Sequence, residues 1–477
     1  MNNLLKKLAA GTLVLGLVLG CGGCGASVPE VTQTTGLIDT GVPDGTTPLN
    51  AKAPVSPHLL DLPNLVAAPE YPVMPQCPRQ EDYPEGSAQF YEDQWEWEQN
   101  RQLYLTASPE NAQELNPFFE TATKQFLSGK DNQVCAPLNI YFALAMLAET
   151  TGGRSQKQIL DVLGHSNMES LRKQAHQLWK AHYCSDSQTV SLMANSVWLD
   201  DAAPFVEDTL STLAADHYAS VFTGDLGTEE MNEQLASWLD SQTGGLLTEY
   251  TEGIRLDPLT VFCLASAAYF RADWSSSFYE GNTYPEVFHA EGRDVTTDFM
   301  HTQFFEHTYY EGKDFSAIQL GLSGGYQMWL ILPDEGSSPK ALLHKGDYYD
   351  LISNPDNWEQ CRRVSLNLSM PKFDVSSEQD LIPGLKAMGI TAACDPKKAD
   401  YSPITPVPVY LGESQHAARV AVDEEGVVAA AYTLLMAPTC GVPERLEEID
   451  FTLNRPFLFA ITGRDALPLF AGVVAEP

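Results

Sequence analysis

Hydrophobic residues follow different periods along the chain, and these periods predict a mixture of helices and strands. Residues 138–147 are apolar on nearly every side, which predicts a helix buried in the centre of a domain. Residues 364–370 alternate apolar and polar side chains, the period of a half-buried strand. Surface helices are predicted where apolar residues recur at helical spacing before a glycine: Met231, Leu235, Trp238 and Leu239, and again Leu381, Leu385 and Met388. Helices cluster early and strands late, which favours an α+β fold over an alternating parallel α/β fold.

An uncharged run of eighteen residues, 426–443, follows Glu424 and Glu425 in a chain whose formal net charge is -35. A glycine followed by small and β-branched residues can form a solvated loop or a strand inside a sheet. The commoner interpretation of such a composition is an ordinary buried strand or helix. If the run becomes a strand, Tyr432 falls on one face. The opposite face then carries Val427, Ala429, Ala431, Thr433 and Leu435.

The segments on either side of this run, residues 416–422 and 450–459, have the character of strands. Together with the Glu-Glu-Gly hinge, they resemble the reactive-centre region of the serpin family. Further segments resemble serpin motifs and stand in the family's order: residues 136–147, 194–199, 268–274, 329–336, 370–373 and 468–472. The resemblance covers roughly residues 111 to 477.

This resemblance implies a serpin fold, with three β-sheets, about eight or nine helices and an exposed reactive-centre loop. It also implies a suicide inhibitor of serine proteases and not an enzyme. The protease cleaves the loop and becomes trapped as a covalent acyl-enzyme while the loop inserts into the main sheet as an extra strand. The hinge and inserting loop would be Glu424, Glu425, Gly426, Val427, Val428, Ala429, Ala430, Ala431, Tyr432 and Thr433.

Two other classes of function were weighed against the inhibitor. A non-inhibitory serpin acting as a binding or carrier module is the alternative. A charge or a proline in the inserting half would have supported it, but neither occurs between Gly426 and Ala437. A hydrolase is less favoured, because no nucleophile and base stand out together.

The reactive bond is placed by counting the seventeen residues usual in the family from Glu424, which gives the bond between Cys440 and Gly441. A small, uncharged side chain before this bond suits elastase-like proteases. Two other bonds stay open: Met436–Ala437 would serve a chymotrypsin-like or elastase-like enzyme, and Arg445 a trypsin-like one. An exposed Cys440 thiol could be oxidised, so redox control is a hypothesis that an inhibition assay before and after peroxide would test.

Two residues depart from the pattern of inhibitory serpins. Val427 stands where such members usually have threonine or serine, and Tyr432 interrupts a run of small residues. Valine is β-branched and should still enter a sheet. Tyr432 points outward in the alternation, so its bulk need not be buried.

The resemblance also identifies a sheet-opening region: Asn139, Ser266, Trp274 and His416. In serpins a histidine ten residues before the hinge glycine lies under the opening of the main sheet, beside a helix serine and a strand asparagine. Here Asn139 and Ser266 occupy those two positions with their types exchanged, and Ala136 replaces another common serine. We expect Asn139 and Ser266 to keep a hydrogen bond, because an unpaired buried polar group costs about 1 to 3 kcal/mol.

The beginning of the chain has the pattern of a bacterial lipoprotein leader. Lys6 and Lys7 precede a short apolar run that ends at Cys21, which predicts a leader over 1–20 and a lipid on Cys21. Cys24 is a weaker alternative site, and a plain secretory leader is the other interpretation. The predicted location is extracytoplasmic, anchored to a bacterial cell membrane or secreted.

Residues 21–110 are rich in proline and acidic residues, which predicts a largely disordered tether before a serpin domain over 111–477. Residues 91–105, which include Trp95 and Trp97, are the exception. They have the composition of a short helix that docks on the domain or on a partner.

Composition and the remaining motifs exclude several functions. The 63 acidic against 28 basic residues argue against nucleic acid, heparin or anionic membrane as a ligand. Residues 321–325 match the G-x-S-x-G hydrolase pattern, but a strand follows where a helix is required, which predicts a hairpin loop. His301 and His307 lack metal-ligand spacing. Nine cysteines show no close-spaced disulfide framework. We therefore expect no metal or cofactor. The family resemblance implies a monomer whose partner is its target protease.

Overall fold

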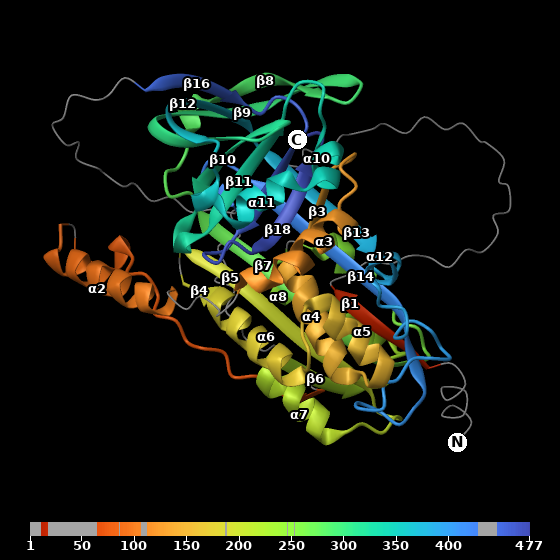
Figure 1. Ribbon diagram of the computed structural model, residues 1–477. Coiled ribbons are helices and arrows are strands. Elements are labelled where there is room, and N and C mark those ends of the chain that lie inside the picture. Colours follow the sequence, from red (N-terminus) through yellow and green to blue (C-terminus); the bar gives the residue numbers. More distant parts are fainter. Residues whose placement is uncertain are drawn as a thin grey trace, which may run out of the picture.

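The computed structural model describes residues 11–17, 64–84, 86–105, 112–186, 188–245, 247–251, 253–427 and 446–477. Two large sheets stand above one another, and most of the helices gather around the lower one (Figure 1). This mixture of segregated helices and mostly antiparallel strands confirms the predicted α+β class.

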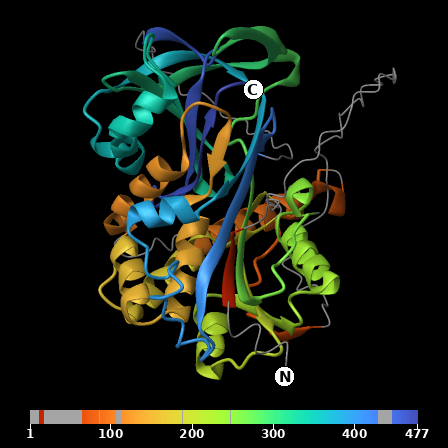
Figure 2. The same ribbon diagram turned by 90° about the vertical axis from the view of Figure 1, so that its right-hand side faces the viewer.

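The main sheet contains nine strands and is centred on β7 (Thr260–Asp273) and β14 (Val409–Val422). Between them lies β1 (Gly11–Leu17), which pairs in parallel with both. Figure 2 shows the three side by side, with β14 in blue, β1 in red and β7 in green. On the far side of β14 lies β13 (Phe373–Asp380). On the far side of β7 follow, in order, β5 (Thr189–Asp200), β6 (Ala219–Gly224) and β2 (Leu65–Ala67). Two short strands complete the sheet: β4 (Cys184–Ser185) pairs with β5, and β15 (Gly426–Val427) pairs with β7.

The second set of strands is joined through β9 (Arg293–Glu311). The first part of β9 pairs with β8 (Thr283–Ala290), most of its length with β12 (Cys361–Pro371), and its last residues with β10 (Phe315–Gly321). Two of the three sheets that the resemblance implies therefore share β9 and are hydrogen-bonded as one set of nine strands. Its other members are β16 (Glu447–Thr452), β11 (Gln327–Pro333), β17 (Phe457–Thr462), β18 (Pro468–Val474) and β3 (Gln133–Cys135).

The helices confirm the hydrophobic periods. Every residue of α4 (Pro137–Thr150) is buried, as the all-round apolar pattern predicts. The apolar side of α8 (Glu229–Gln242) packs on the main sheet through Met231, Leu235 and Trp238. The other described α-helices are α2 (Ala88–Leu105), α3 (Asn116–Phe126), α5 (Gly153–Leu163), α6 (Met168–His182), α7 (Glu207–Asp216), α9 (Thr248–Thr251), α10 (Pro339–Lys345), α11 (Asp347–Ser353) and α12 (Ile382–Met388). With α4 and α8, the described chain has eleven α-helices, more than the eight or nine expected, because α2 precedes residue 111 and α9 has only four residues.

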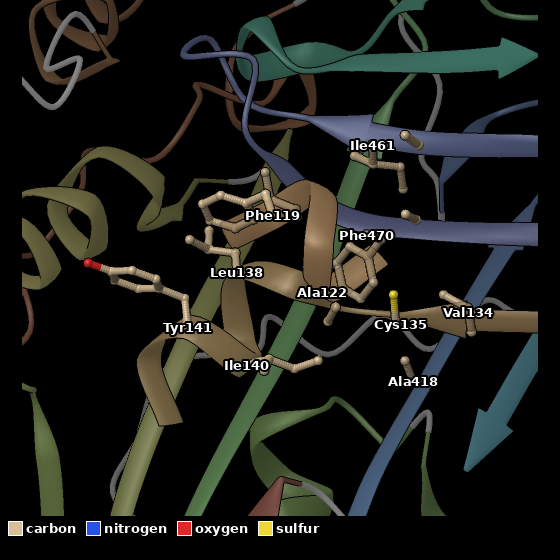
Figure 3. Close-up of a cluster of buried hydrophobic side chains, with 14 of the residues drawn as sticks. Phe119, Ala122, Val134, Cys135, Leu138, Ile140, Tyr141, Ala418, Ile461 and Phe470 are labelled. Carbon is tan, nitrogen blue, oxygen red and sulfur yellow. The ribbon is translucent and has the colours of Figure 1, made fainter. Parts of the chain in front are cut away.

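The core lies where α4 meets the two sheets. Figure 3 shows Leu138 and Ile140 of α4 among Phe119 and Ala122 of α3 and Phe470 of β18. These side chains are at most 4% exposed. A polar residue that projects from α4 towards the main sheet, such as Asn139, must therefore find its hydrogen bonds inside the protein.

The segment before residue 111 differs from its prediction over residues 64–105. Instead of extending as a tether, it pairs β2 with β6 and packs Tyr71 against Trp179 and Tyr183. It then continues into α2, which confirms the predicted helix over 91–105 and begins it at Ala88. The proline-rich composition predicted disorder, but a few aromatic side chains such as Tyr71 pack on the folded domain and order the segment. Within the described parts of the chain, no helix is long and apolar enough to cross a membrane.

Candidate functional site

The candidate site is the space between β7 and β14. Leu17, the last residue of β1, aligns with Ser266 on one side and with His416 on the other. Beyond Leu17, no strand of the described chain pairs with both β7 and β14. A cavity of about 20 Å³ lies there, lined by residues of both strands that include Ala268, Phe270, Ala417 and Ala418. The main sheet therefore parts at this point.

The hinge lies at the end of β14 and reaches across to β7. Gly426 and Val427 form β15, which pairs antiparallel with Asp273 and Ala272 of β7. A Cβ atom on Gly426 would lie 2.4 Å from the carbonyl oxygen of Ala272, so only glycine fits. Val427 is 2% exposed and belongs to the core. The first residue predicted to insert thus already lies in the sheet.

Trp274 holds the hinge from the β7 side. Its indole Nε1 donates to the carbonyl oxygen of Asp423 at 2.9 Å, and its backbone N–H donates to the carbonyl oxygen of Glu425 at 3.0 Å. The backbone N–H of Phe278 donates to the carbonyl oxygen of Glu424 at 3.1 Å. The predicted hinge and Trp274 therefore form one hydrogen-bonded unit.

Glu424 is also held by charge. Its carboxylate lies 2.9 Å from the Lys372 ammonium, and its side chain is 11% exposed. Burial by itself raises the pKa of Glu424, but the hydrogen bond from Lys372 and the attraction of that ammonium outweigh it, so the pKa is lowered. Among the described residues no cation pairs with Glu425, and burial together with neighbouring Asp423, Glu280 and Glu424 raises its pKa. Lys372 lies in one of the motifs that carried the family resemblance.

The polar cluster under the sheet opening is centred on Ser266 of β7. Its hydroxyl donates a hydrogen bond to Asn139 Oδ1 at 2.5 Å, and the same hydroxyl oxygen lies 2.7 Å from Asn195 Oδ1. Asn139 Nδ2 donates back to the carbonyl oxygen of Ser266 at 3.3 Å. The predicted contact between Asn139 and Ser266 is confirmed. Sequence reasoning missed Asn195 of β5 as a member, because the same strand also carries Ser191 and Ser196 and a single asparagine does not stand out among them.

His416 lies beside this cluster and makes a separate contact. Its Nε2 accepts the backbone N–H of Ala136 at 3.1 Å, while its buried Nδ1 has no hydrogen-bond partner among the described residues. Complete burial lowers the pKa of His416 to about 4. The imidazole is therefore neutral at physiological pH, and Nε2 is the acceptor nitrogen.

Several predicted residues lie outside the described part of the chain. These are Cys21, Cys440, Gly441 and the loop residues Val428, Ala429, Ala430, Ala431, Tyr432 and Thr433. The leader, the lipid and the reactive bond therefore stay predictions.

The rejected motifs lie where the sequence predicts them. Ser323, of the G-x-S-x-G pattern, lies in the turn between β10 and β11, and its hydroxyl forms a hydrogen bond with Thr189 Oγ1 at 2.7 Å. His301 and His307 lie along β9. No group of three or more metal-ligating side chains is arranged for an ion in the described residues.

Comparison with known proteins matches this geometry. The family model for Serpin (serine protease inhibitor) covers residues 115–477. Serpin B11 of Mus musculus is 27% identical over 369 residues, covering 73% of this chain and 94% of that protein. Plasminogen activator inhibitor 1 of Bos taurus is 26% identical over 357 residues, covering 72% and 87%.

Solved structures agree on the fold. The thermophilic serpin tengpin in its native state has a TM-score of 0.68 at 25% identity, covering 78% of this chain and 96% of that one. A thyroxine-binding globulin in complex with thyroxine has a TM-score of 0.66 at 20% identity, covering 76% and 98%. A mixed fold whose main sheet parts beside a buried hinge is that of a serpin. The chain belongs to the serpin family.

The neutral, buried state of His416 predicts a pH dependence of stability. In the unfolded chain histidine takes up a proton near pH 6.5, whereas the folded protein resists it until about pH 4. The free energy of unfolding should therefore fall as pH drops from about 6.5 to 4, by up to about 3 kcal/mol. Urea unfolding of the wild type and of His416→Gln across this range measures it. The variant should lose this part of the slope, and His344→Gln, at an exposed histidine, should keep it. An equal slope in wild type and His416→Gln would contradict the assignment.

The contact between Asn139 and Ser266 predicts energetic coupling. Asn139→Ser and Ser266→Asn should each lower the free energy of unfolding, because each disturbs a buried hydrogen bond. The double variant should recover part of the loss, with a coupling of about 0.5 to 3 kcal/mol. The measurement is a double-mutant cycle by urea unfolding. Additive losses would show that the two side chains do not depend on one another.

Proposed function

We propose that this chain is a suicide-substrate inhibitor of serine proteases, with a preference for elastase-like enzymes. The observation that carries the proposal is the hinge: Gly426 and Val427 already pair with β7 at the end of the space between β7 and β14. Continuing β15 by further residues would extend an antiparallel ladder along β7. This direction of entry is the one that loop insertion requires.

The chemistry follows the acyl-transfer reaction of the protease. The protease serine attacks the carbonyl carbon of Cys440, and the bond from that carbon to the Gly441 nitrogen breaks. An ester to the serine oxygen forms, and the protease histidine passes the serine proton to the leaving Gly441 amine. The loop is then attached to the sheet only through its hinge and can insert.

Insertion supplies the free energy for trapping. Each new backbone hydrogen bond contributes about 0.5 to 1.5 kcal/mol, so about a dozen supply on the order of 10 kcal/mol before side-chain packing is counted. The protease is carried along with the inserted loop and distorted before water can cleave the ester. On this account the uncleaved fold is a kinetic trap.

The leader bears on this mechanism because β1 fills part of the same space. A loop folding back from the end of β14 runs antiparallel to β14, whereas β1 runs parallel to it. We propose that residues 1–20 are removed and that Cys21 becomes the lipidated first residue of the mature chain, which takes β1 away and leaves the space to the loop. The mature protein would then be held by its lipid outside a bacterial cell membrane.

One observation supports the alternative function, a non-inhibitory serpin that acts as a binding or carrier module. The thyroxine-binding globulin whose structure resembles this chain is described in complex with thyroxine, so a serpin fold can serve as a binding module. The described hinge favours inhibition, because Glu424 to Val427 carry no proline, and both acidic side chains precede the inserting residues.

The inhibitor proposal predicts a covalent complex. The chain without residues 1–20 should form, with neutrophil or pancreatic elastase, a complex that survives denaturing electrophoresis. Mass spectrometry should find a released peptide that begins at Gly441. Clean cleavage without a complex by elastase and by chymotrypsin-like and trypsin-like proteases would instead support the non-inhibitory alternative.

Two neighbouring loop alanines provide a matched pair of variants. By alternation from buried Val427, Ala431 enters on the core face and Ala430 on the outer face. Ala431→Arg should lower the yield of complex about tenfold or more in favour of cleaved inhibitor, since insertion would bury an unpaired charge. Ala430→Arg should leave most of the complex intact. Equal yields from the two variants would contradict insertion in this register.

A further inference from the structure

The segment before the serpin domain docks on both faces of the main sheet. We call residues 64–84 and 86–105 the N-terminal arm. At its beginning, β2 pairs with β6, and Asn64 Nδ2 donates to Gln234 Oε1 of α8 at 3.2 Å. Further on, the Tyr71 ring stacks on Tyr183, with ring centroids 5.8 Å apart, at the end of α6. The apolar residues of α6 and α8 belong to separate hydrophobic clusters, one on each side of the sheet.

The far end of the arm is fixed by a buried ion pair. Arg101 Nε lies 2.7 Å from Asp186 Oδ2, and the two side chains are 7% and 2% exposed. The other carboxylate oxygen of Asp186 accepts the backbone N–H groups of Gln188 and Thr189 at 2.9 and 2.7 Å. The Arg101 guanidinium also lies 5.0 Å from the centre of the Trp97 ring. A buried arginine that pairs with the turn before β5 fixes the arm to the start of that strand.

A chain of hydrogen bonds leads from Arg101 to the hinge. Arg101 Nη2 donates to Thr189 Oγ1 at 2.8 Å, and Thr189 Oγ1 lies 2.7 Å from Ser323 Oγ. Ser323 Oγ accepts the backbone N–H of Asp273 at 3.1 Å. Asp273 is the residue of β7 that pairs with Gly426. Three hydrogen bonds thus join the arm to the strand end on which the loop must begin to insert.

We propose that Arg101 is a positioning residue for sheet opening, and that the docked arm slows insertion of the loop. Above Leu17 the space between β7 and β14 holds a cavity of only about 20 Å³, so a further strand can enter there only if this end of β7 moves farther from β14, and β7 carries β5, β6 and the overlying α8 with it. The arm ties β6 and α8 to α6 on the opposite face, and through Arg101 it holds the ends of β5 and β7. These contacts oppose further parting of β7 and β14 above Leu17. The inference rests on the proposed function in that insertion is the step it controls.

Arg101→Gln tests the inference without a protease. The probe is a synthetic peptide with the sequence of residues 427–440, added to the chain without residues 1–20. Its incorporation is followed by native electrophoresis and mass spectrometry. We expect Arg101→Gln to speed incorporation about tenfold or more, equivalent to about 1.4 kcal/mol in the barrier. Arg79→Gln is the matched control in the same arm, because its pair with Asp82 is exposed, and it should leave the rate unchanged.

Ser323→Ala provides a second variant that breaks the hydrogen-bond chain without touching Arg101. It should also speed incorporation, and the double variant should be no faster than the faster single one, because both act through the same contacts. If Arg101→Gln fails to fold, Ser323→Ala still decides the question. The transition temperature of the loop-cleaved form should be the same in all variants, whereas a merely structural role would lower it together with that of the uncleaved form.

Each outcome supports or overturns the inference. Unchanged or slower incorporation in both folded variants would overturn it, as would a wild type that never takes up the peptide. A wild type that takes up the peptide but traps no protease would refute the inhibitor proposal and leave the role of Arg101 standing. Faster uptake in Arg79→Gln as well would show that any change in the arm has this effect, which also overturns the role of Arg101.

Discussion

Backbone hydrogen bonding along the facing edges of β7 and β14 is the constraint on which the rest of the structure depends. A strand edge inside a sheet presents N–H and C=O groups that are costly to leave unpaired. Below Ser266 and His416, β1 pairs with both edges, and at the top β15 pairs with the end of β7. Between these positions, the edges can be completed by a strand that comes from the chain itself. The hinge, the polar cluster and the arm all lie around this interval.

The hinge and the buried polar contacts around this interval have opposite effects on strand insertion: the hinge favours it and the polar contacts resist it. The hinge brings Val427 to the edge of β7, where a ladder can continue. The contacts of Ser266 with Asn139 and Asn195 join β7 to α4 and β5, and the His416 contact joins β14 to the start of α4. These polar contacts are buried, so breaking one during opening leaves its partners unsatisfied. Specific bonds therefore hold β7 and β14 in place, while the free energy of strand addition favours filling the interval between them.

Much of the fold was predictable because strong periods are set by burial alone. The all-round apolar pattern of α4 and the alternation in β12 arise from which faces touch the core, and both were predicted with the correct element type. The hinge and the Asn139–Ser266 contact were predictable because the family resemblance supplied their neighbourhood. The helix of the arm was predicted over 91–105, but the docking of the segment before it was not, since single residues such as Tyr71 hold that segment and a proline-rich composition hides them. Asn195 was missed because a buried asparagine has no period.

The central claim is that the main sheet gains a strand from the cleaved loop, and a thermal unfolding measurement tests it most directly. The chain without residues 1–20 would be cut once within the loop and its unfolding followed by circular dichroism beside the uncut chain. The account predicts that the cut chain unfolds at a temperature more than about 10 °C higher, because about a dozen new backbone hydrogen bonds are formed. An unchanged or lower transition temperature after a single verified cut would contradict it.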